Sequence, residues 1–241
     1  MTEFTELTQE YQRLADDVQY RRNHQDEDGM MLTGITLSAT PEQIREFYDQ
    51  VQSKGLPNPS GGDEYGPNAL ASMFVDMLIR NSYRAQQNGF EINGPAKDLL
   101  YMIRGDPANK LRVIIRGDLS DSLYCAEFID LTVTGDVRGD FAYKAKGVQV
   151  KIAGTLDLNN SGDEPFVDAL DSTFVLNTLR NVPRALYSVE HGPSNCIFKT
   201  GNENTLDFLL ERMPFGNVII RIKTDGTEMI KQGIDDHSRR N

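Results

Sequence analysis

The sequence of 241 residues is poor in several residue types, and each shortage narrows the class of protein. It contains no tryptophan, two cysteines and three histidines. Two cysteines are too few for a disulfide framework and fit a reducing compartment such as the cytoplasm. The three histidines do not stand at metal-ligand spacing from one another. We therefore expect neither a disulfide-stabilised scaffold nor a histidine-based metal centre.

The chain also lacks long apolar runs and any excess of positive charge. No apolar stretch approaches the roughly 20 residues of a membrane-spanning helix. The first residues, MTEFTELTQEYQRL, are acidic and polar, unlike a signal or transit peptide. Lysine and arginine total 25 against 36 acidic residues, which gives a net charge of −11. We expect a soluble cytoplasmic protein whose partners include neither nucleic acid nor membrane.

Helix signals are concentrated in the first 89 residues. Apolar residues recur at three- and four-residue steps over residues 3–22. Thr40-Pro41-Glu42-Gln43 then has the form of a capped helix start, and that helix is expected to stop at Gly55. A further amphipathic helix is predicted over residues 69–87, and a strand over residues 30–38. This α-rich region is predicted to cap or to bind a neighbouring structure.

From residue 90 onward a repeat appears, aligned on Gly117, Gly135 and Gly154, which are 18 and 19 residues apart. Aspartate follows the first two glycines, and threonine follows the third. Apolar residues stand four before, two before and two after each glycine: Val113, Leu131 and Val150; Ile115, Val133 and Ile152; Leu119, Val137 and Leu156. Gly94 marks an earlier copy, with Phe90 and Ile92 at the two inward positions.

A period of this length with alternating apolar residues is typical of a solenoid whose stacked coils share one core. We therefore predict a mainly β protein: a right-handed parallel β-solenoid with an α-rich N-terminal region. The expected divisions are residues 1–89 for the α-rich region, 90–228 for the solenoid and 229–241 for a polar C-terminal tail. The alternative is a twisted antiparallel sheet whose strands are evenly spaced.

The segment VTGDVRGDFAYKAKGVQVKIAGTLD resembles the glycine-repeat (GXGXG) β-helix of the glutamate synthase C-terminal domain, and is similar to the corresponding subunit of formylmethanofuran dehydrogenase. Lys146-Gly147-Val148 is similar to that family's Lys-Gly-Gly turn, and Asp140-Phe141-Ala142-Tyr143 to its aspartate-aromatic-small-aromatic segment. The resemblance covers about residues 111–157. It implies a structural and subunit-contact element and no catalytic residue. Bactofilin-like filament formers are a second resemblance at the same repeat length.

The segment DLNNSGDEPFVD, residues 157–168, supports a calcium hypothesis. Oxygen-bearing residues and a glycine fall where a calcium loop needs them. The candidate ligands are Asp157, Asn159, Ser161, Asp163 and Asp168, with Gly162 at the turn. No other cofactor is expected. The alternative is an acidic, solvated insertion between two coils.

Two further patterns have a simpler structural explanation. His191, Ser194 and Cys196 share one short window, but no orienting acid is evident there, so we expect a turn with Cys196 as a small buried residue. Arg-Gly-Asp occurs at residues 104–106, 116–118 and 138–140. We interpret these tripeptides as corners of the solenoid rather than as adhesion motifs.

The sequence therefore predicts a non-catalytic scaffold, assembly or interaction protein, such as an accessory subunit of a larger complex. Its expected partner is another protein or a second copy of the chain. The alternative is an enzyme or small-ligand-binding protein that uses a groove along one side of the solenoid. That alternative requires Tyr124, Tyr143, Lys144 and Arg138 to converge on one face.

Overall fold

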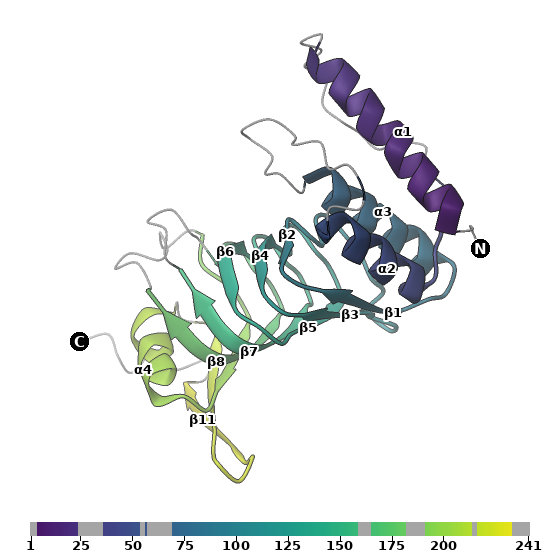
Figure 1. Ribbon diagram of the computed structural model, residues 1–241. Coiled ribbons are helices and arrows are strands. Elements are labelled where there is room, and N and C mark those ends of the chain that lie inside the picture. The colour runs from purple at the N-terminus through teal and green to yellow at the C-terminus, as the bar shows by residue number, and fades with distance from the viewer. Residues whose placement is uncertain are drawn as a thin grey trace.

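The computed structural model describes residues 4–23, 36–53, 56, 69–158, 165–181, 191–213 and 216–232. It confirms the predicted fold class: the protein is mainly β, with a parallel β-solenoid of about five turns and an N-terminal helical region (Figure 1). Because the strands pair in parallel, the antiparallel alternative is wrong. No helix in these ranges is long and apolar enough to cross a membrane.

The N-terminal region consists of α1 (Phe4–Asn23), α2 (Pro41–Gln52) and α3 (Ala69–Arg84). The predicted capping box at the start of α2 is present, with Thr40 and Gln43 each accepting a backbone N–H of the other. One aromatic cluster holds the three helices together, because the rings of Tyr11, Phe47 and Phe74 lie 4.9–5.4 Å apart.

The strand predicted over residues 30–38 is absent where it can be checked, since residues 36–40 pair with no strand. Residues 30–35 lie outside the described ranges. Side chains of α3 bind the backbone of this segment instead: Ser82 hydrogen bonds to both polar groups of Ala39, and Asn81 donates to the carbonyl of Leu37. The backbone is thus satisfied without a neighbouring strand.

The longest side of the solenoid is a sheet of seven parallel strands followed by one antiparallel strand. Its parallel strands are β1 (Gly89–Asn93), β3 (Leu111–Arg116), β5 (Ile129–Val133), β7 (Gln149–Asp157), β8 (Thr173–Arg180), β9 (Ile197–Thr200) and β10 (Val218–Ile222). The predicted register is confirmed, because Phe90, Val113, Leu131 and Val150 are successive partners. All four side chains are buried.

The second side is shorter and contains β2 (Ala96–Lys97), β4 (Leu119–Ser122), β6 (Val137–Phe141) and the ends of β7 and β8. Leu119, Val137 and Leu156 are aligned in register and buried, as the repeat predicted. The third side has single bridges rather than strands. These bridges join Arg104, Glu127, Lys146, Leu170 and Ser194 in succession.

The corner between the first two sides explains why glycine is followed by aspartate. Asp118 Oδ1 accepts the backbone N–H of Asp136 at 2.9 Å, and Asp136 Oδ1 accepts that of Thr155 at 2.7 Å. A Cβ atom on Gly135 would collide with the same Asp118 carboxylate and with the backbone of Gly117. Glycine leaves room for the carboxylate that bonds the next coil.

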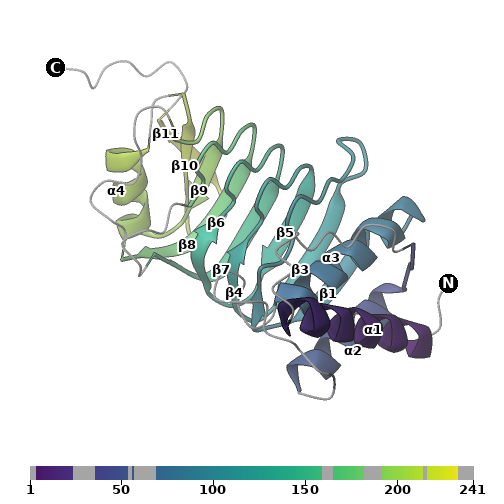
Figure 2. The ribbon, with the colours of Figure 1, turned by 90° about the horizontal axis from the view of Figure 1, so that it is seen from above.

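Different elements close the two ends of the solenoid (Figure 2). Helices α2 and α3 cover the first coil, where Ser72 Oγ donates to the carbonyl of Lys97 at 2.6 Å. At the other end, α4 (Glu203–Arg212) begins at the N-cap Asn202 and contacts β8, β9 and β10. The last strand, β11 (Glu228–Gln232), pairs antiparallel with β10 through an irregular register. It lies largely in the predicted C-terminal tail, of which residues 233–241 are outside the described ranges.

Candidate functional site

A column of three tyrosines runs along the third side of the solenoid. The rings of Tyr101 and Tyr124 stack with centroids 4.9 Å apart and planes 9° apart. The rings of Tyr124 and Tyr143 stack at 4.6 Å and 10°. The backbone fixes this spacing, because Met102 N–H donates to the carbonyl of Tyr124 and Cys125 N–H to that of Tyr143. The rings therefore repeat at the spacing of the coils.

Each of the first two tyrosines sits between two residues with left-handed backbone conformation. Leu100 and Met102 flank Tyr101 with φ of 64° and 52°, and Leu123 and Cys125 flank Tyr124 with φ of 66° and 51°. Such angles are unfavourable for residues other than glycine. The coil adopts them because this turn points the leucine into the core and the tyrosine outward.

We call the outward surface of the third side the tyrosine face. It has three columns, each with one residue per coil: Tyr101, Tyr124, Tyr143, Val167 and His191; Met102, Cys125, Lys144, Asp168 and Gly192; Arg104, Glu127, Lys146, Leu170 and Ser194. Seven large apolar side chains are exposed among the described residues, and four belong to this face: Tyr101 (51%), Met102 (56%), Tyr124 (36%) and Leu170 (37%). The exposed apolar surface is thus concentrated here.

Charged groups surround the aromatic column. Lys144 Nζ lies 5.1 Å from the centroid of the Tyr143 ring, and its hydrogen bond with that tyrosine raises the pKa of the lysine. Arg104 pairs with Glu127 at 2.7 Å across one coil. Because these pairs are exposed, each contributes little to stability. These side chains place both positive and negative charges beside the tyrosine rings.

A buried carboxylate on α3 holds the first coil of this face in place. Asp76 accepts the backbone N–H groups of Leu100 at 2.8 Å and Tyr101 at 2.9 Å, and it is 4% exposed. Burial raises the pKa of Asp76 to about 7, against the opposing effect of its two hydrogen bonds and of Arg80. The helical cap and the tyrosine face are therefore directly connected.

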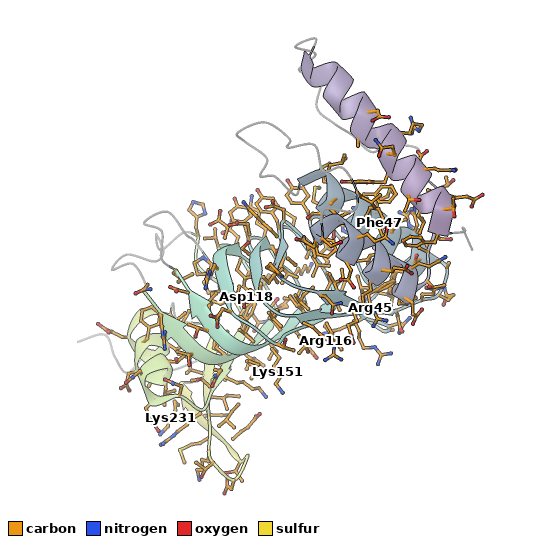
Figure 3. The ribbon with its side chains drawn as sticks, in the orientation of Figure 1. Arg45, Phe47, Arg116, Asp118, Lys151 and Lys231 are labelled. Atoms are coloured by element: carbon orange, nitrogen blue, oxygen red, sulfur yellow. The ribbon has the colours of Figure 1, made fainter. Side chains whose placement is uncertain are left out.

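The outer surface of the long sheet has two open hollows, of about 400 and 480 Å³. Arg45 and Arg112 line the first, and both Arg45 and Arg116 pair with Glu91 beside it. Lys151 and Lys199 line the second together with Val175 and Ile197. Figure 3 shows Arg45, Arg116 and Lys151 on this outer surface. The hollows do not include the tyrosine column.

The structure describes only part of the predicted calcium loop. Asp157 Oδ1 accepts a hydrogen bond from Asn181 Nδ2 at 2.7 Å, and Asp168 pairs with His191 Nδ1 at 3.4 Å. The remaining candidates, Asn159, Ser161 and Asp163, lie outside the described ranges, as does Gly162. Within those ranges no group of three histidine, cysteine or acidic residues has a metal-binding arrangement. The calcium loop stays a prediction.

The expectation that Cys196 is a buried residue in a turn is confirmed. Its thiol points into the core and donates to the carbonyls of Ala169 and Ser194 at 3.5 and 3.3 Å. Burial raises the pKa of Cys196 to about 11. His191 is exposed and pairs with Asp168 on the tyrosine face. The histidine therefore has a carboxylate partner, and the thiol has backbone partners.

Three of the four residues proposed to converge do so: Tyr124, Tyr143 and Lys144 lie together. Arg138 does not, because it lies on β6 in the second side, 3.9 Å from Asp136. Tyr101 belongs to the column but was not predicted. It stands 23 residues before Tyr124, whereas Tyr124 and Tyr143 are 19 apart. The signal for it was the offset from the aligned glycines, because Tyr101 stands seven residues after Gly94 and Tyr124 seven after Gly117.

Comparison with known proteins identifies no relative of this chain. No family model matches the sequence, and no curated protein or solved structure matches the chain.

Proposed function

We propose that this protein is a non-catalytic interaction or assembly module that docks another protein on its tyrosine face, for example as an accessory subunit of a larger complex. The observation that carries the proposal is the gathering of exposed Tyr101, Met102 and Tyr124 beside Arg104. Tyrosine, methionine and arginine are the side chains enriched at protein interfaces, and tyrosine and arginine dominate their energetic centres.

The rigidity of the face also supports binding. Stacked rings whose backbones are bonded to the neighbouring coil have little freedom left to lose when a partner arrives. Preordering of this kind reduces the entropy lost on association. A solenoid supplies such a surface because each coil repeats the position of the one before it.

The sequence resemblance to glycine-repeat β-helices is consistent with a subunit-contact role, which those domains have. Both cysteines are free thiols. Free thiols fit a reducing compartment, so we place the protein in the cytoplasm.

A second candidate function is small-ligand binding on the outer surface of the long sheet. The observation that favours it is the hollow with Lys151 and Lys199 around Val175, which suits a ligand with a carboxylate and an apolar part. Lys199 is already paired with Glu228 at 2.7 Å. Lys151 is therefore the residue whose replacement tests this candidate.

The test compares three variants of the full chain as bait in native cell extract. Tyr124→Ala removes the middle ring, whereas Ile114→Ala removes a side chain of similar exposure, 38% against 36%, from the long sheet. Lys151→Ala probes the hollow. We expect one partner to be retained by wild type, Ile114→Ala and Lys151→Ala and lost by Tyr124→Ala. Retention by Tyr124→Ala would contradict the proposal, and loss by Lys151→Ala alone would favour the second candidate.

A further inference from the structure

We infer that the tyrosine face binds a second copy of this chain, with the two solenoids side by side and parallel. The inference rests on the proposed function and names its partner. The relevant symmetry is a two-fold axis that runs along the solenoid direction through the middle of the face. That operation keeps each coil level with the same coil of the second copy. It exchanges the two outer columns of the face.

The exchanged columns are chemically complementary. Tyr101 comes opposite Arg104 of the second copy, and Tyr143 comes opposite Lys146, so each ring meets a cation. A guanidinium or ammonium group over an aromatic ring is attractive. Arg104 is 74% exposed in its side chain, so its guanidinium is accessible while it pairs with Glu127.

The remaining coils follow the same pattern. The hydroxyl of Tyr124 comes opposite the carboxylate of Glu127, which accepts its proton in a hydrogen bond. One coil further on than Tyr143, Val167 is only 5% exposed, so the exposed Leu170 supplies the apolar surface there. Each pair between the outer columns occurs twice, because the contact is isologous, and the assembly closes at two copies.

The opposite orientation is unfavourable when its axis lies at the level of Tyr124. A two-fold axis across the coils would run the second solenoid antiparallel and place each column against itself. With the axis at the level of Tyr124, Glu127 would face Glu127 and Arg104 would face Lys146. Like charges directly opposed cost free energy. The parallel arrangement avoids both contacts.

The overall charge disfavours the second side as the contact surface. A chain with a net charge of −11 repels its copy over most of its surface. The second side carries six aspartates against three basic residues on its strands and corners: Asp98, Asp118, Asp121, Asp136, Asp140 and Asp157; Lys97, Arg138 and Arg180. The tyrosine face instead has three basic and two acidic residues. A second copy therefore meets less repulsion at this face than at the second side.

The middle column lies at the axis, where each residue meets its own copy. Met102 meets Met102, which adds apolar contact. Lys144 approaches Lys144, and Asp168 in the next coil approaches Asp168. The two lysines and the two aspartates offset each other across one coil step, and Asp168 already acts on the lysine electrostatically. Cys125 is half-buried and lies at the axis one coil before Lys144. Two Cys125 thiols therefore lie close together in the pair.

The face is small, so the association is weak. Four residues span roughly 13 Å at about 3.3 Å each, and four steps between coils span roughly 19 Å at about 4.8 Å each. Such a patch covers about 250 Å² on each copy, or about 500 Å² for the pair, which is less than the roughly 1,000 Å² of a stable specific interface. We expect a monomer–dimer equilibrium that depends on concentration.

The experiment uses the full chain and its one accessible thiol. Sedimentation velocity over a wide concentration range should show conversion from monomer to dimer. A short bis-maleimide should yield covalent dimer through Cys125, and the Cys125→Ser variant should yield none.

Tyr124→Glu places two carboxylates together and should weaken the association about tenfold or more. Adding Glu127→Lys should restore it, while Ile114→Glu on the long sheet should leave it unchanged.

The wild-type cross-link remains informative if Tyr124→Glu fails to fold, which circular dichroism would reveal. A monomer at every concentration would overturn the inference, as would a dimer that neither cross-links through Cys125 nor responds to Tyr124→Glu. A monomer that still captures a different protein through the tyrosine face would overturn only the second-copy inference. Loss of both activities would overturn the proposed function as well.

Discussion

Asp118 and Asp136 are joined across one coil of the solenoid, because Asp118 Oδ1 accepts the backbone N–H of Asp136 at 2.9 Å. The next coil repeats the contact, with Thr155 as donor to Asp136. Gly135 lies against the same carboxylate and has no room for a Cβ. Glycine and aspartate therefore form one structural unit, in which the aspartate of one coil needs the glycine of the next.

Replacing Gly135 with alanine should destabilise the protein by about 1–3 kcal/mol, because the added methyl group displaces either the Asp118 carboxylate or the backbone of Gly117. Urea denaturation of the variant gives the change in the free energy of unfolding. Gly89→Ala is the matched control, since a Cβ there meets nothing within 4 Å. Equal stability of the two variants would contradict the proposed role of the corner.

Replacing Val133 with aspartate should unfold the solenoid. Val133 is fully buried in the long sheet, and an unpaired carboxylate there would lose its hydration without gaining a partner. Thr132→Asp, one residue earlier, faces outward and should melt close to wild type. Thermal melts followed by circular dichroism distinguish the two. A cooperative melt of Val133→Asp at the wild-type temperature would show that the inward assignment is wrong.

Stability should fall as the pH rises from about 4 to about 7, through the ionisation of Asp76. Burial raises the pKa of Asp76 from 3.8 to about 7 in the folded chain. The folded state therefore binds this proton more tightly than the unfolded state, and the stabilisation present at low pH is lost as pH passes 7. The slope from this group is about 1.4 kcal/mol per pH unit at most.

The Asp76→Asn variant isolates that slope. Asparagine retains one acceptor for the two N–H groups of Leu100 and Tyr101, so one part of the loss of stability is the same at every pH. The difference between variant and wild type should nevertheless shrink as the pH rises towards 8. Urea denaturation at several pH values measures it. A difference that is independent of pH would mean that Asp76 does not titrate in this range.

The two thiols should react at very different rates. Cys125 is partly accessible, whereas Cys196 is buried and burial raises its pKa to about 11. Because the thiolate is the reactive form, a disulfide reagent at mild alkaline pH should label one thiol quickly in the folded protein. The second should react only after denaturation. Cys125→Ser should remove the fast reaction, and two fast thiols would contradict the buried position of Cys196.

The calcium-loop hypothesis predicts saturable binding of calcium at millimolar concentration or below, as in other oxygen-ligand loops. Isothermal titration calorimetry on the full chain measures it. Asp168→Asn should weaken the binding, because it removes the carboxylate at the last loop position. Asp118→Asn, at a corner of the second side, is the control for non-specific charge effects. No heat of binding at millimolar calcium would remove the hypothesis.

Much of the fold could be predicted because the responsible contacts repeat in the sequence. Val113, Leu131 and Val150 occupy the same position in three coils, so the register followed from their spacing. The capping box at Thr40 is a local sequence motif and could be predicted for the same reason. In both cases the residues that determine the structure are close in sequence or recur at one interval.

The contacts that could not be predicted join segments that share no pattern. Asp76 on α3 accepts the backbone N–H of Tyr101, and no motif or repeat interval in the sequence indicates this contact. Residues 30–38 resembled a strand, but in their described part Asn81 on α3 donates to the carbonyl of Leu37 instead. Tyr101 was missed because the first coil is longer than the next two, which moves its tyrosine out of the period.

The final strand bears on how a second copy could attach to the end of the solenoid. β11 runs against the direction of the seven strands before it, and its irregular pairing with β10 twists the sheet where a further coil would attach. Helices α2 and α3 occupy the corresponding position on the first coil. Both ends thus oppose end-to-end stacking, and growth into a filament along the solenoid direction is disfavoured. The association proposed above uses the flank of the solenoid instead, where an isologous contact would close at two copies.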